Sequence, residues 1–401
     1  MMRSLRAFAR AWKGLRRFNA LDPKTRSVVF YAEDEGSWAH FERIIGELTD
    51  NFARDVCYLT SSETDPVLAT RRGRLHAFYV GAGSVRTWLF LALRCGVLTM
   101  TMPSLESFHI KRSRVAPVHY AYLFHSLASS HMIYLEDAFD HYDTILCSGP
   151  HHRLEVRARE AAAGLPPKRL VDVGYGRLDT ILAESGRLST GESPRKDSAT
   201  RVLVAPSWGP NGLLETRAVE LVRTLLDAGF RVTVRPHPMT TCKRPDVIDS
   251  LRTSFGARAD FELETTVATW KSLREADVMI SDWSGVALEY AFGFERPVLF
   301  VDVPRKVNNP NYGDLGCEPL EVTVRGEVGE VIAPGSLETI PDTVRAMRRE
   351  RERYVRRIRD ARSRHVFNVG ASGRRGAEAI LEMLEVADDG QRGKVEAVRT
   401  A

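Results

Sequence analysis

A histidine with a stiffened backbone on both sides is the first residue of this chain that could do chemistry. His237 lies between Pro236 and Pro238. Arg235 precedes Pro236 and directly follows the apolar run 232–234. The two prolines restrict the backbone, which lowers the entropy cost of presenting the ring. An imidazole beside a guanidinium suits a diphosphate, whose charge must be stabilised during a displacement. The other interpretation is a cis-proline turn with an incidental imidazole.

A second histidine, His125, lies at a comparable position. It follows the apolar run 118–124 and precedes Ser126, so its ring can point away from the end of a buried strand. Histidine titrates near neutral pH and suits a general base. Most single histidines are instead partly buried and satisfied by the backbone. Six of the eleven histidines fall between His119 and His152, but their irregular spacing argues against a metal site, and we expect none.

Two loops, 205–212 and 281–285, each lead from an apolar run into a helical pattern. They offer hydroxyl groups, glycines and backbone N–H groups. Glycine lets the backbone approach a ligand closely, and a helix N-terminus favours a phosphate. The alternative for the first loop is a tight turn with Trp208 as a packing lid. The alternative for the second loop is an ordinary helix N-cap at Asp282 or Ser284. Together with Arg235, the two loops give the predicted donor-binding residues Ser207, Trp208, Gly209, Arg235, Ser281, Asp282, Ser284, Gly285 and Glu289.

The elements that must position these residues alternate along the chain. Short β-rich apolar runs and helical patterns follow one another from residue 27 onward, which is typical of parallel sheets covered by helices. The chain is also too long for one hydrophobic core. We therefore predict an α/β architecture of two doubly wound Rossmann-like domains facing a central cleft, with ligands at the strand ends. The expected segments are a basic N-terminal segment 1–26, a first domain 27–184, a linker 185–200, a second domain 201–335, and C-terminal helices 336–401 that could cross back to the first domain.

The positive charge is concentrated at the N-terminus. Residues 1–26 hold eight Lys/Arg and one Asp, a net +7 against +5 for the whole chain, so the remainder carries −2 and no nucleic-acid partner is expected. Leu5, Phe8, Trp12 and Leu15 recur at helical spacing among the basic residues. This pattern predicts that residues 1–20 lie on an anionic membrane surface, and the alternative is an arm packed on the body. The five scattered cysteines fit a reducing cytoplasm.

An ordered set of motifs resembles the CDP-glycerol glycerophosphotransferases, the teichoic-acid primase and polymerase family. FHS stands where that family has a WHG-like motif, LVAPSW resembles an APTW-like motif, and VGYGRLD resembles a G-x-P-R-x-D element. RPHP and SDWSGVALEYA complete the set. The motifs occupy 124–126, 203–208, 173–179, 235–238 and 281–291.

The resemblance implies a GT-B fold and transfer of glycerol phosphate from CDP-glycerol to an acceptor hydroxyl, with release of CMP and no required metal or cofactor. It implies that His125 is the general base and that His237 contacts or protonates the diphosphate. It also places the nucleotide at Ser281, Asp282, Ser284 and Gly285. Ser126 and Arg177 would serve the acceptor or phosphate side.

The partners expected from these arguments are a CDP-activated donor, a lipid-linked or polysaccharide acceptor and the inner face of the plasma membrane, where a cytoplasmic protein would bind peripherally. Two other functions fit the same residues. One is a GT-B glycosyltransferase that uses a nucleotide sugar in capsule or lipopolysaccharide synthesis, with attack at carbon. The other is a membrane-associated scaffold without turnover.

Overall fold

The computed structural model describes residues 2–107, 110–188, 199–266 and 270–399. The chain divides into two compact units. The first unit contains Met1–Ser126, Tyr134–Thr180 and Val366–Ala401, and the second contains Leu127–Ile133 and Ile181–His365. No helix of the described residues has the length and apolar character needed to span a bilayer.

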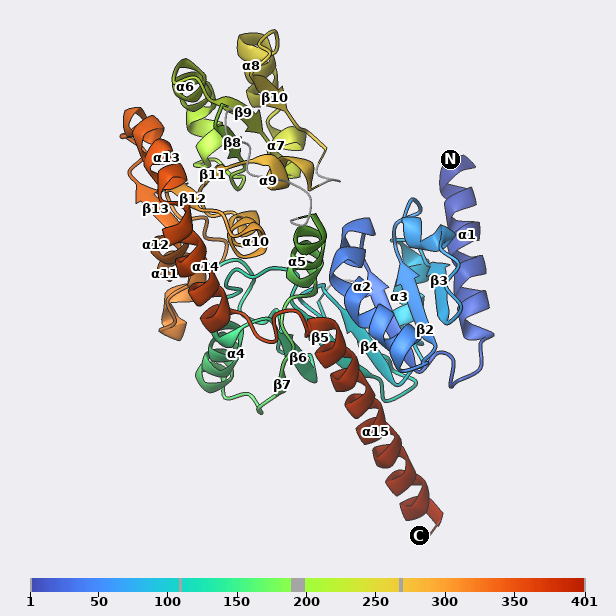
Figure 1. Cartoon of the computed structure of the whole chain (residues 1–401). Helices are drawn as coiled ribbons and strands as arrows, with labels where there is room; N and C mark the ends of the chain where they lie inside the picture. Colours follow the sequence, from blue (N-terminus) through green and yellow to red (C-terminus); the bar gives the residue numbers. More distant parts are fainter. Residues whose placement is uncertain (1, 108–109, 189–198, 267–269, 400–401) are drawn as a thin grey trace. The chain divides into compact units, whose positions relative to one another are not determined.

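The first unit is built on a parallel sheet of seven strands (Figure 1). Its order, β3-β2-β1-β4-β5-β6-β7, reverses direction between β1 and β4. In open α/β sheets, ligands bind at the carboxyl ends of the strands beside such a reversal. The strands are β1 (Val28–Ala32), β2 (Val56–Thr60), β3 (Leu75–Tyr79), β4 (Val97–Met100), β5 (His119–Leu123), β6 (Thr144–Cys147) and β7 (Arg169–Asp172).

Helices cover both faces of this sheet. Successive residues of β1 alternate between two cores, because strand side chains point to opposite faces. Val29 and Tyr31 pack in the core that includes side chains of α1, α3 and α4, whereas Phe30 packs in the core that includes α2 and α15. The helices of this unit are α1 (Met2–Asn19), α2 (Trp38–Gly46), α3 (Ser84–Leu91), α4 (Pro150–Ala163), α5 (Gly176–Leu188), which continues into the second unit, and α15 (Ser372–Arg399).

The second unit repeats the same strand order in a parallel sheet of six strands, β10-β9-β8-β11-β12-β13, with its reversal between β8 and β11. Its strands are β8 (Arg201–Val204), β9 (Arg231–Val234), β10 (Phe261–Leu263), β11 (Val278–Ser281), β12 (Val298–Val301) and β13 (Gly329–Ile332). Its helices are α6 (Leu213–Asp227), α7 (Pro238–Lys243), α8 (Pro245–Phe255), α9 (Lys271–Glu275), α10 (Gly285–Phe294), α11 (Leu320–Thr323), α12 (Arg325–Val328), α13 (Ile340–Arg349) and α14 (Arg351–His365).

The predicted fold class is confirmed, since both units are parallel Rossmann-like sheets covered by helices. The two units meet in sequence at Thr180 and Ile181, inside α5 and before the expected linker, most of which lies outside the described residues. The expected C-terminal segment 336–401 is divided: α13 and α14 belong to the second unit, and α15 belongs to the first.

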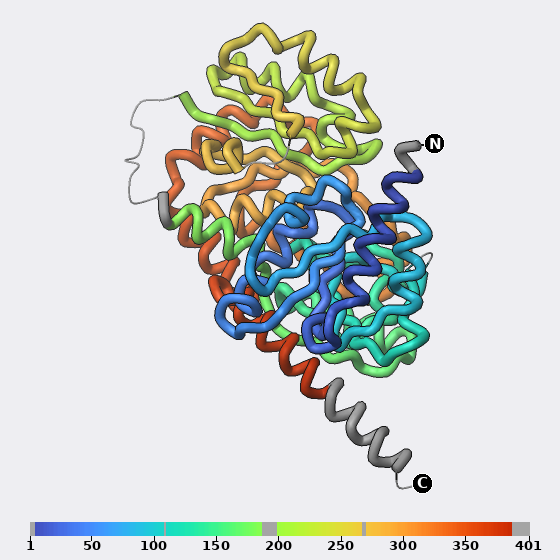
Figure 2. Tube along the Cα trace, turned by 90° about the vertical axis from the view of Figure 1, so that its right-hand side faces the viewer, coloured from blue at the N-terminus to red at the C-terminus, as the bar shows by residue number. Residues whose placement is uncertain are grey.

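The N-terminal helix α1 runs along the side of the first unit, where Figure 2 shows it in dark blue. Ala11, Leu15 and Phe18 are buried in the core that includes Phe78 of β3. Gly14 lies so close to the strand that an added Cβ would stand 2.0 Å from the Tyr79 carbonyl oxygen. The predicted apolar stripe is therefore corrected at Leu15, which faces the protein.

Three other apolar residues of α1 face outward. Leu5, Phe8 and Trp12 are 61%, 51% and 44% exposed. Arg6, Lys13 and Arg16 are exposed on the same helix. The helix is thus an arm packed on the body that still presents apolar and basic groups to its surroundings.

Candidate functional site

Asp282 connects the two loops that begin at the reversal point of the second sheet. One carboxylate oxygen accepts the backbone N–H groups of Ser207 and Trp283, each at 2.6 Å, and the other accepts the N–H of Leu213 at 3.3 Å. Burial raises the pKa of Asp282, and the N–H groups of Ser207 and Leu213 oppose that shift. Asp282 is 1% exposed, and its carboxylate holds the two loops together.

Of the other predicted residues in the segment 281–291, two are buried in the protein and two lie at the start of α10, where a ligand could bind. Ser281 is fully buried and donates its hydroxyl to the Ala205 carbonyl at 2.8 Å, and Glu289 is buried inside α10. Ser284 is the N-cap residue of α10, and its side chain makes no capping hydrogen bond. Gly285 begins the helix. The α10 N-terminus therefore keeps a hydroxyl and backbone N–H groups available for an anion.

Cationic groups gather around Trp208 in the same unit. The Nζ atoms of Lys306 and Lys243 lie 4.3 and 4.9 Å from the centre of the Trp208 ring, and the His237 ring centre lies 6.1 Å from it. Burial lowers the pKa of Lys306, and the Asp282 and Glu215 carboxylates oppose that shift. Sequence reasoning missed Lys306, because a single lysine in a loop without a pattern carries no signal.

His237 contributes a neutral hydrogen-bond donor to this cluster. Its Nδ1 accepts the backbone N–H of Met239 at 3.1 Å and caps α7. Burial and the charge of Lys306 lower the pKa of His237 to about 4. At neutral pH the ring therefore carries its single proton on Nε2, the atom opposite the cap. Both flanking peptide bonds are trans, so the cis-proline interpretation is wrong.

Arg235 and Gly209 shape the surrounding loops. The Arg235 guanidinium is buried, lies 3.7 Å from the Glu264 carboxylate and donates to the Ser272 hydroxyl at 3.3 Å. The guanidinium of Arg235 therefore pairs with Glu264, the residue that directly follows β10. Gly209 has a φ of +148°, a conformation that residues with a side chain rarely adopt.

In the first unit, His125 follows β5 and its ring is held by tyrosines. Its Nε2 lies 3.0 Å from the Tyr134 hydroxyl, and its Nδ1 lies 3.5 Å from the Tyr122 hydroxyl. Burial lowers the pKa of His125, against opposing contributions from the Thr101 backbone and Asp34. The ring is therefore neutral at pH 7 and has the protonation state of a general base.

The segment VGYGRLD places further residues near His125. Tyr175 donates its hydroxyl to the His125 carbonyl at 3.1 Å. The charge of Arg177 lies close enough to His40 of α2 to help lower the pKa of the imidazole. Asp179 accepts the backbone N–H groups of Gly370 and Ser372 at 2.6 and 2.9 Å, ahead of α15. The aspartate of this motif thus holds the C-terminal helix to the first unit.

Ser126 ends the first stretch of the first unit. The next residues, 127–133, belong to the second unit, where the Ser129 N–H donates to Glu321 at 2.8 Å and the Asn309 amide donates to the His131 carbonyl at 2.9 Å. The chain returns to the first unit at Tyr134, the partner of His125 Nε2.

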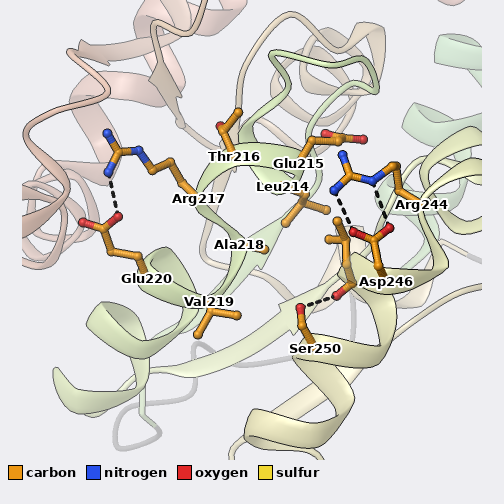
Figure 3. A pocket seen from close by; sticks show the side chains of 11 residues that line it. Leu214, Glu215, Thr216, Arg217, Ala218, Val219, Glu220, Arg244, Asp246 and Ser250 are labelled. Carbon is orange, nitrogen blue, oxygen red and sulfur yellow. Dashed lines mark hydrogen bonds and ion pairs between the residues drawn. The ribbon is translucent and has the colours of Figure 1, made fainter.

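A separate pocket of about 310 Å³ lies between α6 and the start of α8 (Figure 3). Four of its charged side chains form two ion pairs, Arg217 with Glu220 at 2.9 Å and Arg244 with Asp246 at 2.7 Å. None of the predicted site residues lines this pocket, so we do not assign the donor to it. The lining residues are Leu214, Glu215, Thr216, Arg217, Ala218, Val219, Glu220, Arg244, Asp246, Val247 and Ser250.

No protein-family model and no curated protein sequence matches the chain. Solved structures do match over nearly the whole length. The wall teichoic acid polymerase TagF, in a form soaked with CDPG, has a TM-score of 0.56 at 12% identity, covering 95% of this chain and 96% of that chain.

Two UDP-GlcNAc 2-epimerases are also similar. The enzyme from Methanocaldococcus jannaschii, in complex with UDP-GlcNAc and UDP, has a TM-score of 0.55 at 11% identity, covering 89% of this chain and 99% of that chain. The enzyme from Neisseria meningitidis, bound to UDP-GlcNAc, has a TM-score of 0.54 at 11% identity, with the same two coverages. These similarities, with two Rossmann-like sheets of the same strand order, define the fold as GT-B.

Proposed function

We propose that the protein transfers glycerol phosphate, or a related polyol phosphate, from a CDP-activated donor to an acceptor hydroxyl and releases CMP. The observation that carries this proposal is the cluster of Trp208, Lys243, Lys306 and the neutral His237 in the second unit. Two ammonium groups and an N–H donor suit a diphosphate, whose leaving phosphate gains charge as its bond to the transferred group breaks.

Further support comes from the adjacent loop ends. The α10 N-terminus offers Ser284 and backbone N–H groups, and Asp282 fixes the loop that carries Ser207 and Trp208. The first unit holds neutral imidazoles at the carboxyl edge of its sheet, among them His125, and a neutral imidazole can accept a proton from the acceptor hydroxyl. The resemblance of the motifs to the CDP-glycerol family supports glycerol phosphate as the transferred group, and the similarity of the fold to TagF agrees with it.

A donor panel tests this proposal. Purified protein is incubated with CDP-glycerol, CDP-ribitol, UDP-GlcNAc and a CMP-sugar in the presence of membrane lipids, and nucleotide release is followed. We expect release of CMP from a CDP-polyol, and its loss in His237→Ala without a change in thermal stability. Turnover of sugar nucleotides alone would instead establish the glycosyltransferase function. No turnover of any donor by the wild type, with cellular function left intact in both His125→Ala and His237→Ala, would support a scaffold without turnover.

A glycosyltransferase that uses a nucleotide sugar is the second candidate. Its donor would carry a nucleotide diphosphate or monophosphate and could use the same lysines and helix N-terminus. The similarity of the fold to enzymes bound to UDP-GlcNAc favours this candidate as much as TagF favours the first. The two reactions differ in the atom attacked, which is phosphorus in the first and carbon in the second.

We further propose that α1 places the protein on the cytoplasmic face of the plasma membrane, where a lipid-linked acceptor would be available. Leu5, Phe8 and Trp12 are exposed on α1, which also carries exposed arginines and a lysine. Apolar groups can enter the headgroup region while basic groups are attracted to anionic lipids. The opposite side of α1 is part of the core, so point substitutions test this proposal better than a deletion.

The double variant Leu5→Ser with Phe8→Ser should co-sediment with phosphatidylglycerol vesicles at least tenfold less than the wild type. Leu154→Ser is the matched control, because Leu154 is 64% exposed on α4 of the same unit. Both variants should keep the wild-type melting temperature. Equal vesicle binding by the double variant and the wild type, or equal binding of the wild type to phosphatidylcholine and phosphatidylglycerol, would contradict membrane docking through α1.

A further inference from the structure

A second histidine, which sequence reasoning did not select, lies beside His125. His40 is in the first turn of α2, the helix that follows β1 at the reversal point of the first sheet. Its ring centre lies 5.9 Å from that of His125 and 5.8 Å from that of Tyr175. His40 therefore occupies the edge of the sheet where a doubly wound domain binds its ligand.

The position of His40 is fixed by its own helix. Arg43, one turn further along α2, donates to the Thr180 hydroxyl at 3.1 Å and to the Asp179 carbonyl at 3.2 Å. A Cβ added at Gly176 would contact the His40 carbonyl at 3.4 Å, so the start of α5 lies close against α2. These contacts fix α2, and with it the His40 backbone, against the start of α5.

The two histidines differ in their hydrogen bonds. Both ring nitrogens of His125 lie near tyrosine hydroxyls, the closer at 3.0 Å. Among the described residues, the ring of His40 makes no hydrogen bond, and its Nδ1 is buried. The side chain is nevertheless only partly buried, which leaves Nε2 as the nitrogen that a substrate can reach.

Electrostatics keeps His40 neutral. Burial lowers the pKa of His40 well below its usual range, and the neighbouring His125 and Arg177 lower it further. Asp34, Tyr122 and Tyr134 are the other titratable groups that interact with His125. Because the His40 ring is neutral and its Nε2 bonds to no protein group among the described residues, Nε2 can accept a proton from a hydroxyl that reaches it.

We propose that His40 Nε2 receives the proton of the attacking acceptor hydroxyl, and that His125, held by Tyr134, is a positioning residue for it. This inference rests on the proposed function. In the step, the acceptor O–H bond breaks and its proton moves to Nε2 as the oxygen bonds to the phosphorus of the glycerol phosphate. The bond from that phosphorus to the bridging oxygen breaks, and CMP leaves with the electron pair. The proton passes to solvent after product release.

The test compares His40→Gln, His40→Asn and His125→Gln with the wild type. Gln keeps a polar group near the position of Nε2, and Asn keeps one near the position of Nδ1. Neither amide can accept the proton. We expect both His40 variants to lose kcat by about 10²–10⁴-fold while CMP still binds and the melting temperature stays within a few degrees. Their rate should no longer fall in acid, and added imidazole should restore part of the activity of His40→Gly. His125→Gln should retain the acid limb of the pH–rate profile.

The contrary result is clear. If His40→Gln keeps kcat within threefold of the wild type and the acid limb disappears only in His125→Gln, His125 is the base and the inference fails. The wild-type donor panel separates this outcome from failure of the proposed function. If the wild type uses only a sugar nucleotide, the same variants apply, because that acceptor hydroxyl must also lose its proton.

Discussion

At the scale of single residues, the structure assigns supporting positions to several side chains that resembled ligand contacts in the sequence. Asp282 and Ser281 bond to the protein itself, and Arg235 pairs with Glu264. His125 and His237 were recognisable because each follows an apolar run. Lys306 and His40 were not, because neither belongs to a local pattern and only the folded chain brings each beside its partner.

His237 should make the stability of the protein depend on pH. Its pKa is lowered to about 4 by burial and Lys306, so the unfolded chain binds a proton near its ordinary pKa of about 6.5 while the folded ring stays neutral. Its contribution to stability is therefore present above about pH 6.5 and is lost as the pH falls toward 4.

Urea unfolding at pH 7, 5.5 and 4.5 measures this effect. We expect His237→Gln to lose less stability between pH 7 and 4.5 than the wild type, and the exposed His141→Gln to match the wild type. An identical pH dependence in His237→Gln and the wild type would show that the ring is not buried beside Lys306 in solution.

At the scale of elements, most of the apolar runs were predictable as strands, and the two short edge strands of the second sheet were not. β1, β2 and β8 are apolar runs with helical patterns beside them, whereas β10 is only Phe261–Leu263 and β13 is Gly329–Ile332. Three or four residues with a glutamate among them give no alternation to detect. The loop between β8 and α6 was placed correctly, but its attachment to β11 through Asp282 depends on sheet order, which local patterns do not contain.

Asp282→Asn should destabilise the second unit. The carboxylate accepts three backbone N–H groups, and an amide replaces one acceptor oxygen with a donor that opposes an N–H. We expect a loss of about 1–3 kcal/mol in the free energy of unfolding. Asp246→Asn, at an exposed ion pair with Arg244, is the control and should change little. Equal stability of the two variants would mean that the loop does not depend on this carboxylate.

At the scale of the whole molecule, strand alternation predicted two Rossmann-like sheets, and the resemblance of the motifs predicted the GT-B fold, which the structure confirms. Local patterns could not show that residues 127–133 belong to the second unit, or that α13 and α14 stay in the second unit while α15 returns to the first. That His125 and His237 face one central cleft stays a prediction. Donor, acceptor and membrane partner stay proposals as well, because fold similarity at about a tenth identity does not identify a substrate.

The identity of the products tests the central proposal most directly. Phosphorus NMR of a reaction containing the wild-type protein, CDP-glycerol and a lipid extract distinguishes attack at phosphorus from attack at carbon. The proposed function predicts equal amounts of CMP and a new glycerol phosphodiester signal. Unchanged CDP-glycerol, together with release of a nucleoside diphosphate when a sugar nucleotide is supplied, would contradict it.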